Sequence, residues 1–440
     1  MSWKDIYKSR VMSAQEAAKI IQSGDRFWTP LALGQPSMPI MEAIADRKDE
    51  LKDVEYIFAL VFRPYKIFKP EYSGTFKLTC GFYSNTPHMQ ELARSEWANF
   101  LPAQSSDVGY KSSQRQLLYP RRTGMITMVA PPDNHGYVNL GVDTFYTQDI
   151  MDQCDWIIAE VNEKMPRTYG QTSIHVSRFN AFVEIPSPMI SPPTPTPSEV
   201  EVKMAENVVK LLRDRDCLQV GIGSVPARIS ELLAVSGLKD LGVHTEMCPS
   251  GTNKLVEKGV VTCKYKKVNP GKIVTAFAVG DSSLYEFVDS NPTVEFRPTS
   301  YANYIPTIAQ EDNVVAINGS VEIDLTGQIV SESLGNTMWT GTGGQLDFVI
   351  GSFWSKGGRA INLLPSTTQN DTVSRIVPYI KTGARVTVPR HYAQYIVTEY
   401  GFANLIGRTE PERAKELIKI AHPKFREELE KGARERGLLR

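Results

Sequence analysis

The segment CLQVGIGSVP, residues 217–226, decides the fold class of this 440-residue chain. Its first four residues are mostly apolar and favour a short buried strand, and its glycines followed by Ser224 and Pro226 favour a tight turn into a helix that Ser224 caps. Backbone N–H groups gathered at such a turn favour a phosphate or a developing oxyanion. A plain strand-to-helix turn is the alternative, because GxG alone lacks the spacing of a dinucleotide site or a P-loop.

The segment LGVHTEMCPSG, residues 241–251, predicts a second strand that ends on one carboxylate, Glu246. An ordinary glutamate has a pKa of about 4.3, so it is ionised at neutral pH and needs no general base. A strand tip that offers a lone carboxylate beside backbone N–H groups suits acyl transfer through a covalent anhydride. A capping or ion-paired glutamate is the alternative. The chain has no GxSxG elbow that would favour a serine nucleophile.

Helical and extended patterns alternate along both halves of the chain. Apolar runs suited to buried strands lie at 125–130, 156–161, 218–221, 273–279, 314–317, 360–364 and 386–388, and helical spacing occurs at 13–23, 200–213, 224–234 and 283–289. This alternation predicts an α/β fold with a mostly parallel sheet and helices on its faces. Ligands of such sheets bind beyond the carboxyl ends of the strands, where both opening segments are expected. The charged C-terminal residues 410–440 predict a solvated helix.

The length of the chain predicts two domains, because one ordinary core does not reach 440 residues. The most proline-rich stretch, PSPMISPPTPTP at residues 186–197, is typical of a stiff extended linker. We therefore expect domains at 1–191 and 192–440, with Glu246 in the second. A long surface loop inside a single domain is the alternative.

The composition favours a cytoplasmic protein that binds neither nucleic acid nor membrane. Lys+Arg and Asp+Glu number 49 each, so the formal net charge is zero. The N-terminus has no signal-peptide pattern, and no apolar run approaches the roughly 18 residues of a membrane span. Five scattered cysteines without a CxxC pair favour free thiols, and six dispersed histidines without HExxH favour no metal site.

Three further places carry residues that could take part in chemistry. Gly341, Gly343 and Gly344 in TGTGGQLDFVIG could close over a thioester or add an oxyanion donor, or they could form a plain turn. Lys356 and Arg359 could meet phosphates or lie in an exposed charged loop. His135, in PPDNHGYVNLG, could act as a general base or simply occupy a turn.

Ten separated segments together carry a family resemblance. They are AAKIIQSGDR, PPDNHGYVNLGV, AEVNEKMPRTYG, QVGIGSVP, GVHTEM, VEIDLTGQIVSES, GTGGQLDF, SKGGRAINLLPST, VTEYGFANLIGRT and IAHPKFREEL. Over nearly the whole chain the sequence resembles the 4-hydroxybutyrate CoA-transferase and acetyl-CoA hydrolase/transferase family, of the class I CoA-transferase type.

The resemblance implies two similar open α/β domains with mostly parallel sheets and an active site in the interdomain cleft. It implies that Glu246 forms the covalent intermediate, that coenzyme A is bound as acyl-CoA, that no metal takes part, and that the protein is a homodimer or higher homo-oligomer. The implied CoA contacts are Gly221, Ile222, Gly223, Ser224, Val225, Val321, Gly343 and Gly344.

The implied reaction moves CoA from a short-chain acyl-CoA, such as acetyl-CoA or butyryl-CoA, to a carboxylic acid such as 4-hydroxybutyrate, butyrate or acetate, through a glutamyl-CoA thioester. An acetyl-CoA hydrolase with the same intermediate is one alternative, and a non-catalytic acyl-CoA sensor is another. Two departures leave the acceptor open: Gln35 stands where related chains often carry Glu, and residues 248–251 read CPSG where they often end in Ser-Asp-Gly.

Overall fold

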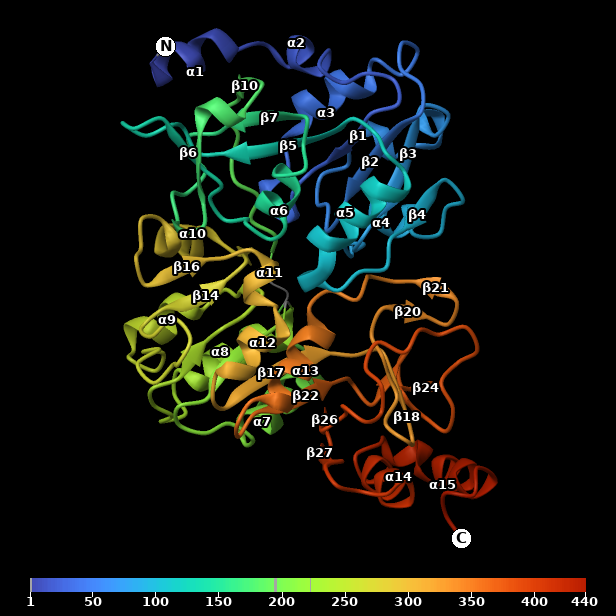
Figure 1. Cartoon of the computed structure of the whole chain (residues 1–440). Coiled ribbons are helices and arrows are strands. Elements are labelled where there is room, and N and C mark those ends of the chain that lie inside the picture. Colours follow the sequence, from blue (N-terminus) through green and yellow to red (C-terminus); the bar gives the residue numbers. More distant parts are fainter. Residues whose placement is uncertain (1, 194–195, 222) are drawn as a thin grey trace. The chain divides into compact units, whose positions relative to one another are not determined.

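The structure is a computed structural model in which residues 2–193, 196–221 and 223–440 are described (Figure 1). The chain forms two compact units. The first consists of residues 1–192, 274–302 and 339–341, and the second of residues 193–273, 303–338 and 342–440. The chain therefore leaves the first unit at Pro192, within the proline-rich stretch, and later returns to it twice.

The first unit is built on a seven-stranded parallel sheet in the order β10-β7-β5-β1-β2-β3-β4. The strands are β1 (Arg26–Trp28), β2 (Val54–Phe58), β3 (Phe76–Cys80), β4 (Ala98–Phe100), β5 (Thr123–Val129), β7 (Trp156–Val161) and β10 (Ala181–Glu184). Every residue of β5 and β7 is buried, as expected for parallel strands covered on both faces. The strands predicted at 125–130 and 156–161 are confirmed.

The helices of the first unit are α1 (Trp3–Arg10), α2 (Ala14–Ala18), α3 (Met38–Ala45), α4 (Pro87–Leu92), α5 (Val108–Leu118), α6 (Thr147–Met151), α10 (Ser282–Val288) and α11 (Thr299–Ala302). Ser13 caps α2 in a capping box with Glu16, as the sequence predicts. The helix is shorter than the predicted 13–23. Arg47 explains the early end, because its Nη1 donates to the carbonyls of Ala18 and Ile21 and so satisfies backbone acceptors without another helical turn.

The second unit carries a six-stranded sheet in the order β12-β11-β17-β22-β26-β27. The strands are β11 (Cys217–Val220), β12 (Gly242–Val243), β17 (Val314–Gly319), β22 (Arg359–Leu363), β26 (Tyr395–Thr398) and β27 (Gly401–Asn404). The first five run parallel and β27 is antiparallel to β26. The predicted α/β class with mostly parallel sheets is confirmed.

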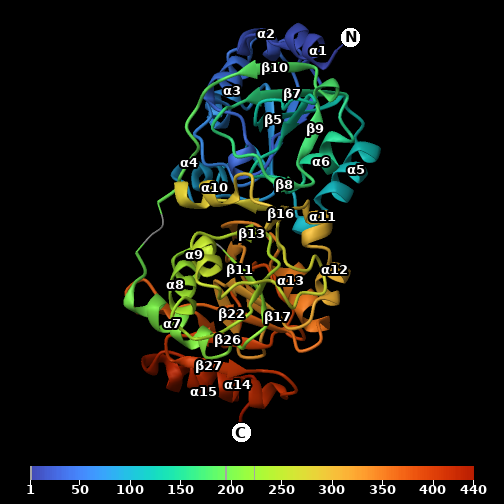
Figure 2. The same ribbon diagram turned by 90° about the vertical axis from the view of Figure 1, so that its left-hand side faces the viewer.

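The helices of the second unit are α7 (Glu199–Val209), α8 (Ser224–Leu233), α9 (Thr252–Glu257), α12 (Ile305–Gln310), α13 (Gln345–Trp354), α14 (Glu410–Lys419) and α15 (Arg426–Glu435). Figure 2 shows β11, β17 and β22 between α8 on one side and α13 on the other. Side chains of β11 alternate between these layers: Cys217 packs with Phe348 of α13, whereas Leu218 and Val220 line a small cavity against α8.

Two predictions about elements of the second unit are wrong. The run at 386–388 forms no strand, and within it Val388 makes only an isolated bridge to Ile329. The C-terminal segment is not one solvated helix. It folds into α14 and α15, whose Leu417 and Leu429 are buried in the same core cluster as β26, because each helix keeps an apolar stripe beneath its charged face.

Short elements complete the chain. They are β6 (Tyr137–Asn139), β8 (Tyr169–Gly170), β9 (Ser173–His175), β13 (Met247–Cys248), β14 (Ile273–Thr275), β15 (Phe277–Ala278), β16 (Val294–Phe296), β18 (Glu322–Asp324), β19 (Ile329–Val330), β20 (Ser333–Leu334), β21 (Thr337–Met338), β23 (Thr367–Thr368), β24 (Val373–Ser374) and β25 (Ile376–Val377). The predicted run at 273–279 is thus divided into β14 and β15. Among the described residues, no helix has the length and apolar character needed to cross a membrane.

Candidate active site

Glu246 lies just beyond the carboxyl end of β12, in a bend before β13. The ladder with β11 extends as far as His244, whose N–H donates to the Leu218 carbonyl at 3.1 Å. Residues 242–245 are buried, and Glu246 is the first half-buried residue after them. The predicted strand tip is therefore observed, and the carboxylate stands at the edge where parallel sheets bind ligands.

The carboxylate of Glu246 is held by a buried amide. Nδ2 of Asn303 donates to Oε2 of Glu246 at 2.5 Å and lies 3.4 Å from Oδ2 of Asp347. Asn303 and Asp347 are both fully buried. One amide nitrogen thus contacts two carboxylates, and its two hydrogens can serve one each. Oδ1 of Asn303 has no hydrogen-bond partner among the described residues.

The backbone of Gly344 lies in close contact with the same carboxylate. It precedes α13, and its carbonyl accepts the helical hydrogen bond from the Phe348 N–H at 3.1 Å. A Cβ at this position would lie 2.0 Å from Oε2 of Glu246 and 2.3 Å from Nδ2 of Asn303, so any side chain would displace them. The carboxylate therefore faces the first turn of a ten-residue helix, where unpaired N–H groups and the helix dipole stabilise negative charge.

Side chains at the start of α13 fix this helix to the sheet. Nε2 of Gln345 donates to Oδ1 of Asn362 on β22 at 2.9 Å, and both residues are buried. Gly343 has φ +56°, a left-handed conformation that glycine adopts without strain. Gly343 therefore gives the turn its left-handed backbone conformation, and Gly344 lies in contact with Glu246.

The turn after β11 differs from its predicted form. The N–H of Gly221 donates to the Ile317 carbonyl at 3.2 Å, so the sheet uses this donor and an oxyanion cannot. Ser224 is the first residue of α8 and caps nothing; its Oγ donates to Oε1 of Glu201 in α7, and the N-cap is Gly223. Both departures arise from contacts between elements that local sequence does not reveal. The ladder with β17 takes the Gly221 N–H, and the packing of α7 on α8 gives the Ser224 hydroxyl its partner.

Space beside this turn is open. A Cβ on Gly221 would approach no atom closer than 3.7 Å, and one on Gly223 none closer than 3.9 Å. Val225 is buried, and Ile222 lies outside the described residues. Val321 follows β17 at the same edge of the sheet, half-buried, with its N–H bonded to the Val330 carbonyl at 2.8 Å.

Comparison with known proteins identifies the family. The model of the acetyl-CoA hydrolase/transferase N-terminal domain matches residues 1–193, and that of the C-terminal domain matches residues 280–433. The chain belongs to the acetyl-CoA hydrolase/transferase family. The resemblance drawn from the sequence is confirmed, and with it the expectation of an enzyme.

Individual relatives match over nearly their whole length. The chain is 38% identical to the 4-hydroxybutyrate coenzyme A transferase of Clostridium kluyveri, with 98% of each chain covered. It is 37% identical to the succinyl-CoA:cyclohexane-1-carboxylate CoA transferase of Geobacter metallireducens, over 98% of this chain and 97% of that one. The crystal structure of RipA from Yersinia pestis superposes with a TM-score of 0.92 at 33% identity and covers both chains completely.

The structure also shows where the remaining candidate residues, Arg359, Lys356 and His135, lie. Arg359 is buried and ion-paired with Asp216, so the expectation of an exposed loop is wrong for Arg359; Lys356 is exposed. Arg359 begins β22 and therefore lies at the amino edge of the sheet, away from Glu246. His135 is exposed in a turn in which its N–H donates to Oδ1 of Asp133 at 2.8 Å, as the turn interpretation expects.

None of the five cysteines offers a reactive thiol. Burial raises the pKa of Cys80, Cys154, Cys217, Cys248 and Cys263, and that of Cys248, two residues from Glu246, to about 12. A buried neutral thiol does not compete with an ionised carboxylate as a nucleophile. Within the described residues no group of three or more His, Cys, Asp or Glu side chains gathers in a way that could hold a metal ion.

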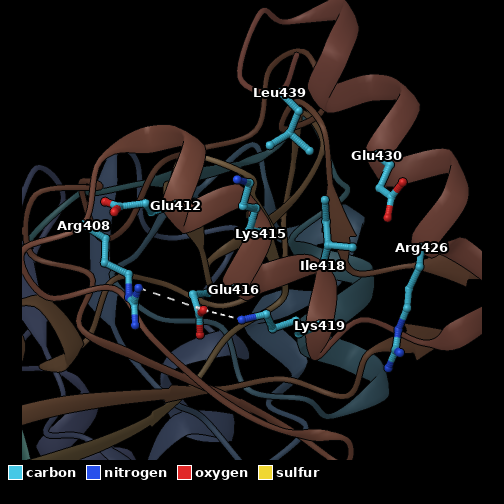
Figure 3. A pocket seen from close by; sticks show the side chains of 9 residues that line it. All are labelled: Arg408, Glu412, Lys415, Glu416, Ile418, Lys419, Arg426, Glu430 and Leu439. Atoms are coloured by element: carbon cyan, nitrogen blue, oxygen red, sulfur yellow. Dashed lines mark hydrogen bonds and ion pairs between the residues drawn. The ribbon is translucent and has the colours of Figure 1, made fainter.

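A surface cavity of about 420 Å³ lies between α14 and α15 (Figure 3). Its charges largely neutralise one another, since Arg408 and Lys419 both reach Oε1 of Glu416, at 4.0 and 2.6 Å. The cavity contains none of the predicted site residues.

The sequence did not identify Asn303 or Asp347 as site residues. Asn303 lies 57 positions after Glu246, and only folding brings the two together. Asp347 carried a weak signal, because an acid in the first turn of a helix after a Gly-rich loop is typical of an N-terminal cap. A capping role, however, does not predict that Asp347 lies beside Asn303.

Proposed function

We propose that the protein is a CoA-transferase that moves CoA from a short-chain acyl-CoA, such as acetyl-CoA or butyryl-CoA, to a carboxylic acid such as 4-hydroxybutyrate, butyrate or acetate. Glu246 is the proposed nucleophile. The observation that supports this role most strongly is the carboxylate held by Asn303 against the backbone of Gly344, at the start of α13. A surface glutamate with only a capping role would not require such a close-fitting glycine.

The proposed reaction proceeds without proton transfer. An oxygen of Glu246 attacks the thioester carbonyl, the C–S bond breaks, and an acyl-glutamyl anhydride and CoA thiolate form. The thiolate attacks the glutamyl carbonyl, so the donor acid leaves as a carboxylate and a glutamyl-CoA thioester remains. The acceptor carboxylate attacks this thioester and regenerates an anhydride and thiolate. The thiolate then attacks the acyl carbonyl, which yields the new acyl-CoA and frees Glu246.

Each step passes through an oxyanion, and the start of α13 is the proposed site that stabilises it. A well-placed donor contributes about 3–4 kcal/mol to such a transition state. Gly221 is excluded as a donor because its N–H is used by Ile317. Asn303 is the second proposed donor, because its amide already lies at hydrogen-bond distance from the reacting carboxylate.

The test is to trap the intermediate. Purified protein is mixed with acetyl-CoA, quenched and digested, and the peptide that contains Glu246 is examined by mass spectrometry for a CoA adduct. We expect the adduct in the wild type and in the matched control Glu257→Ala, an exposed glutamate of α9, and none in Glu246→Ala. Absence of the adduct together with full transfer activity of Glu246→Ala would refute the proposal.

Hydrolysis is the second candidate, because the family description names hydrolases beside transferases. Water would then intercept the same intermediate, so the outcome depends on how well the closed site excludes solvent. The rate of thiol release from acetyl-CoA with and without added butyrate distinguishes the two activities. A transferase exchanges acyl groups and releases little free CoA, whereas a hydrolase releases CoA at the same rate without an acceptor.

A further inference from the structure

Arg375 lies at the carboxyl edge of the second sheet, and no salt bridge joins it to any of the described residues. Three arginines among the described residues have a buried Nε with no hydrogen bond: Arg228, Arg297 and Arg375. Arg228 pairs with Glu231 at 2.8 Å and Arg297 with Glu295 at 3.2 Å. Arg375 makes no ion pair within 4.0 Å to any carboxylate in the part of the chain that the structure describes. A half-buried guanidinium in this state has lost part of its hydration without gaining an ion pair, and a bound anion would compensate for that loss.

One side-chain hydrogen bond anchors the guanidinium of Arg375, and two backbone hydrogen bonds fix its main chain. Its N–H donates to the Ser366 carbonyl at 2.9 Å, beyond the end of β22, and its carbonyl accepts from the Ile323 N–H in β18 at 3.0 Å. Nη1 donates to the Val321 carbonyl at 3.2 Å. Nε makes no hydrogen bond to any described residue, and the Val321 carbonyl uses one N–H of Nη1, so donors of the guanidinium remain for a ligand.

The electrostatic surroundings of Arg375 favour the binding of an anion. Burial lowers the pKa of Arg375, and the charge of Glu322 opposes this shift only in part. Glu322 is itself engaged, because its Oε1 accepts the Lys381 N–H at 3.0 Å. An incoming phosphate would restore the interactions that the guanidinium gives up on leaving water.

We propose that Arg375 binds a phosphate group of coenzyme A, with the pantetheine arm reaching from Val321 to Glu246. This inference rests on the proposed function. The acceptor carboxylate is the competing anion, but its carboxylate is the reacting group and must lie at Glu246. Val321 follows β17 and Glu246 follows β12, and β11 lies between them, so two strand spacings of about 4.8 Å separate the two positions by about 10 Å or more.

Donors that lack the phosphates provide the decisive experiment. Transfer to butyrate is measured for the wild type, Arg375→Gln, Arg375→Lys and the control Arg434→Gln, an exposed arginine of α15. The donors are acetyl-CoA, acetyl-dephospho-CoA and acetyl-pantetheine. We expect Arg375→Gln to lower kcat/KM for acetyl-CoA by about 10- to 100-fold, the usual effect of losing a charge-assisted hydrogen bond, and to leave that for acetyl-pantetheine unchanged.

Acetyl-dephospho-CoA then identifies the phosphate. If the variant loses as much with this donor as with acetyl-CoA, Arg375 binds the pyrophosphate; if it loses nothing, Arg375 binds the 3′-phosphate, and both results support the proposal. Arg375→Lys should recover part of the rate, because a lysine keeps the charge but not the fork. Equal losses with acetyl-CoA and acetyl-pantetheine, or a raised KM for butyrate with an unchanged KM for acetyl-CoA, would overturn it.

Calorimetric titration with CoA separates this inference from the proposed function. A wild type that transfers acyl groups while Arg375→Gln and Arg375→Lys bind CoA with wild-type affinity refutes the role of Arg375 alone. A wild type that neither binds CoA nor transfers an acyl group refutes the proposed function and this inference together. Circular dichroism melting of each variant identifies a loss that comes from misfolding, and in that case Arg375→Lys decides the outcome.

Discussion

Two Gly-rich helix starts lie in the second unit, and they use glycine for opposite purposes. Before α13, the missing side chain of Gly344 leaves room for a carboxylate, since a Cβ there would lie 2.0 Å from Oε2 of Glu246. Before α8, Gly221 and Gly223 have open space beside them, and the N–H of Gly221 already belongs to the sheet. The sequence showed GIGS and GTGGQ as similar motifs.

Glycine density therefore says little about which turn takes part in catalysis. The start of α13 is in direct contact with Glu246, the proposed nucleophile, so small changes in backbone position there should alter the rate. The start of α8 offers open space and a backbone conformation that only glycine adopts without strain, so changes there should alter stability or ligand affinity. The predictions below test this division.

Gly344→Ala should have the largest effect. The added methyl group displaces either Glu246 or the start of α13, and a displacement of about 1 Å at a reacting group lowers the rate by about 100-fold. Misplacement of the backbone N–H donors at the start of α13 adds to this, so we expect kcat to fall by about 10²- to 10³-fold. Steady-state transfer from acetyl-CoA to butyrate measures it.

Gly221→Ala is the matched control for this prediction. Its methyl group would meet no atom within 3.7 Å, so kcat should stay within about threefold of the wild type. An equal loss of kcat in both variants would mean that the two helix starts are not functionally different.

Asn303→Ala should have the second largest effect, a decrease of about 10²-fold in kcat, because the amide that orients Glu246 is removed. Asn303→Asp should be worse than Asn303→Ala, since it places a third carboxyl group beside Glu246 and Asp347. Rapid-quench measurement of the glutamyl-CoA adduct checks both. Wild-type adduct formation in Asn303→Asp would show that this contact is not used in the reaction.

Gly223→Ala should destabilise the fold by about 1–3 kcal/mol, because φ +128° and ψ −174° lie in a region that only glycine adopts without strain. Urea unfolding measures this free energy. Gly319→Ala is the control, since Gly319 has no neighbour within 4 Å and no positive φ. If Gly223→Ala were as stable as the control, strain at the start of α8 would be ruled out.

Ser224→Ala should have the smallest effect, about 1 kcal/mol at pH 7, and the effect should depend on pH. Burial raises the pKa of Glu201, but hydrogen bonds from Ser224 and Ser198 outweigh it and hold the pKa below 4.5. A carboxyl whose folded pKa is lowered stabilises the fold above its unfolded pKa, and this contribution disappears as the pH falls through the folded value.

Urea unfolding of Ser224→Ala and the wild type should therefore differ at pH 7 and converge towards pH 3. Ser236→Ala provides the comparison, because Oγ of Ser236 donates to the Leu233 carbonyl, which does not titrate. A Ser224→Ala difference that is the same at both pH values would mean that the contact with Glu201 contributes nothing.

The strands and the strand-tip position of Glu246 could be predicted because their signals are local. Apolar runs such as WIIAEV and VVAI reveal buried parallel strands without any knowledge of their neighbours, and the carboxylate after GVHT follows from its place at a strand end. The run at 386–388 shows the limit of this approach. It has strand-forming residues, but its backbone pairing is confined to one residue: the N–H groups of Thr387 and Val388 both donate to the Ile329 carbonyl, and Val388 forms an isolated bridge there.

Charged residues were the least predictable. Arg359 and Arg375 are both arginines beside short strands, and the sequence drew attention to the first. Folding gives Arg359 a buried partner in Asp216, 143 positions away, and gives Arg375 only the Val321 carbonyl. Whether a cation is satisfied depends on residues that local sequence does not contain.

The alternation of strands and helices, the α/β class and the position of Glu246 at a strand tip follow from the sequence, because hydrophobic periodicity and turn residues act over a few positions. Only folding places Asn303 and Gly344 against this carboxylate, bonds the Gly221 N–H to the Ile317 carbonyl, and leaves Arg375 without an ion pair to any described carboxylate. These are contacts between segments tens of residues apart, and a hydrogen bond or a steric limit exists only once both of its atoms have been brought together.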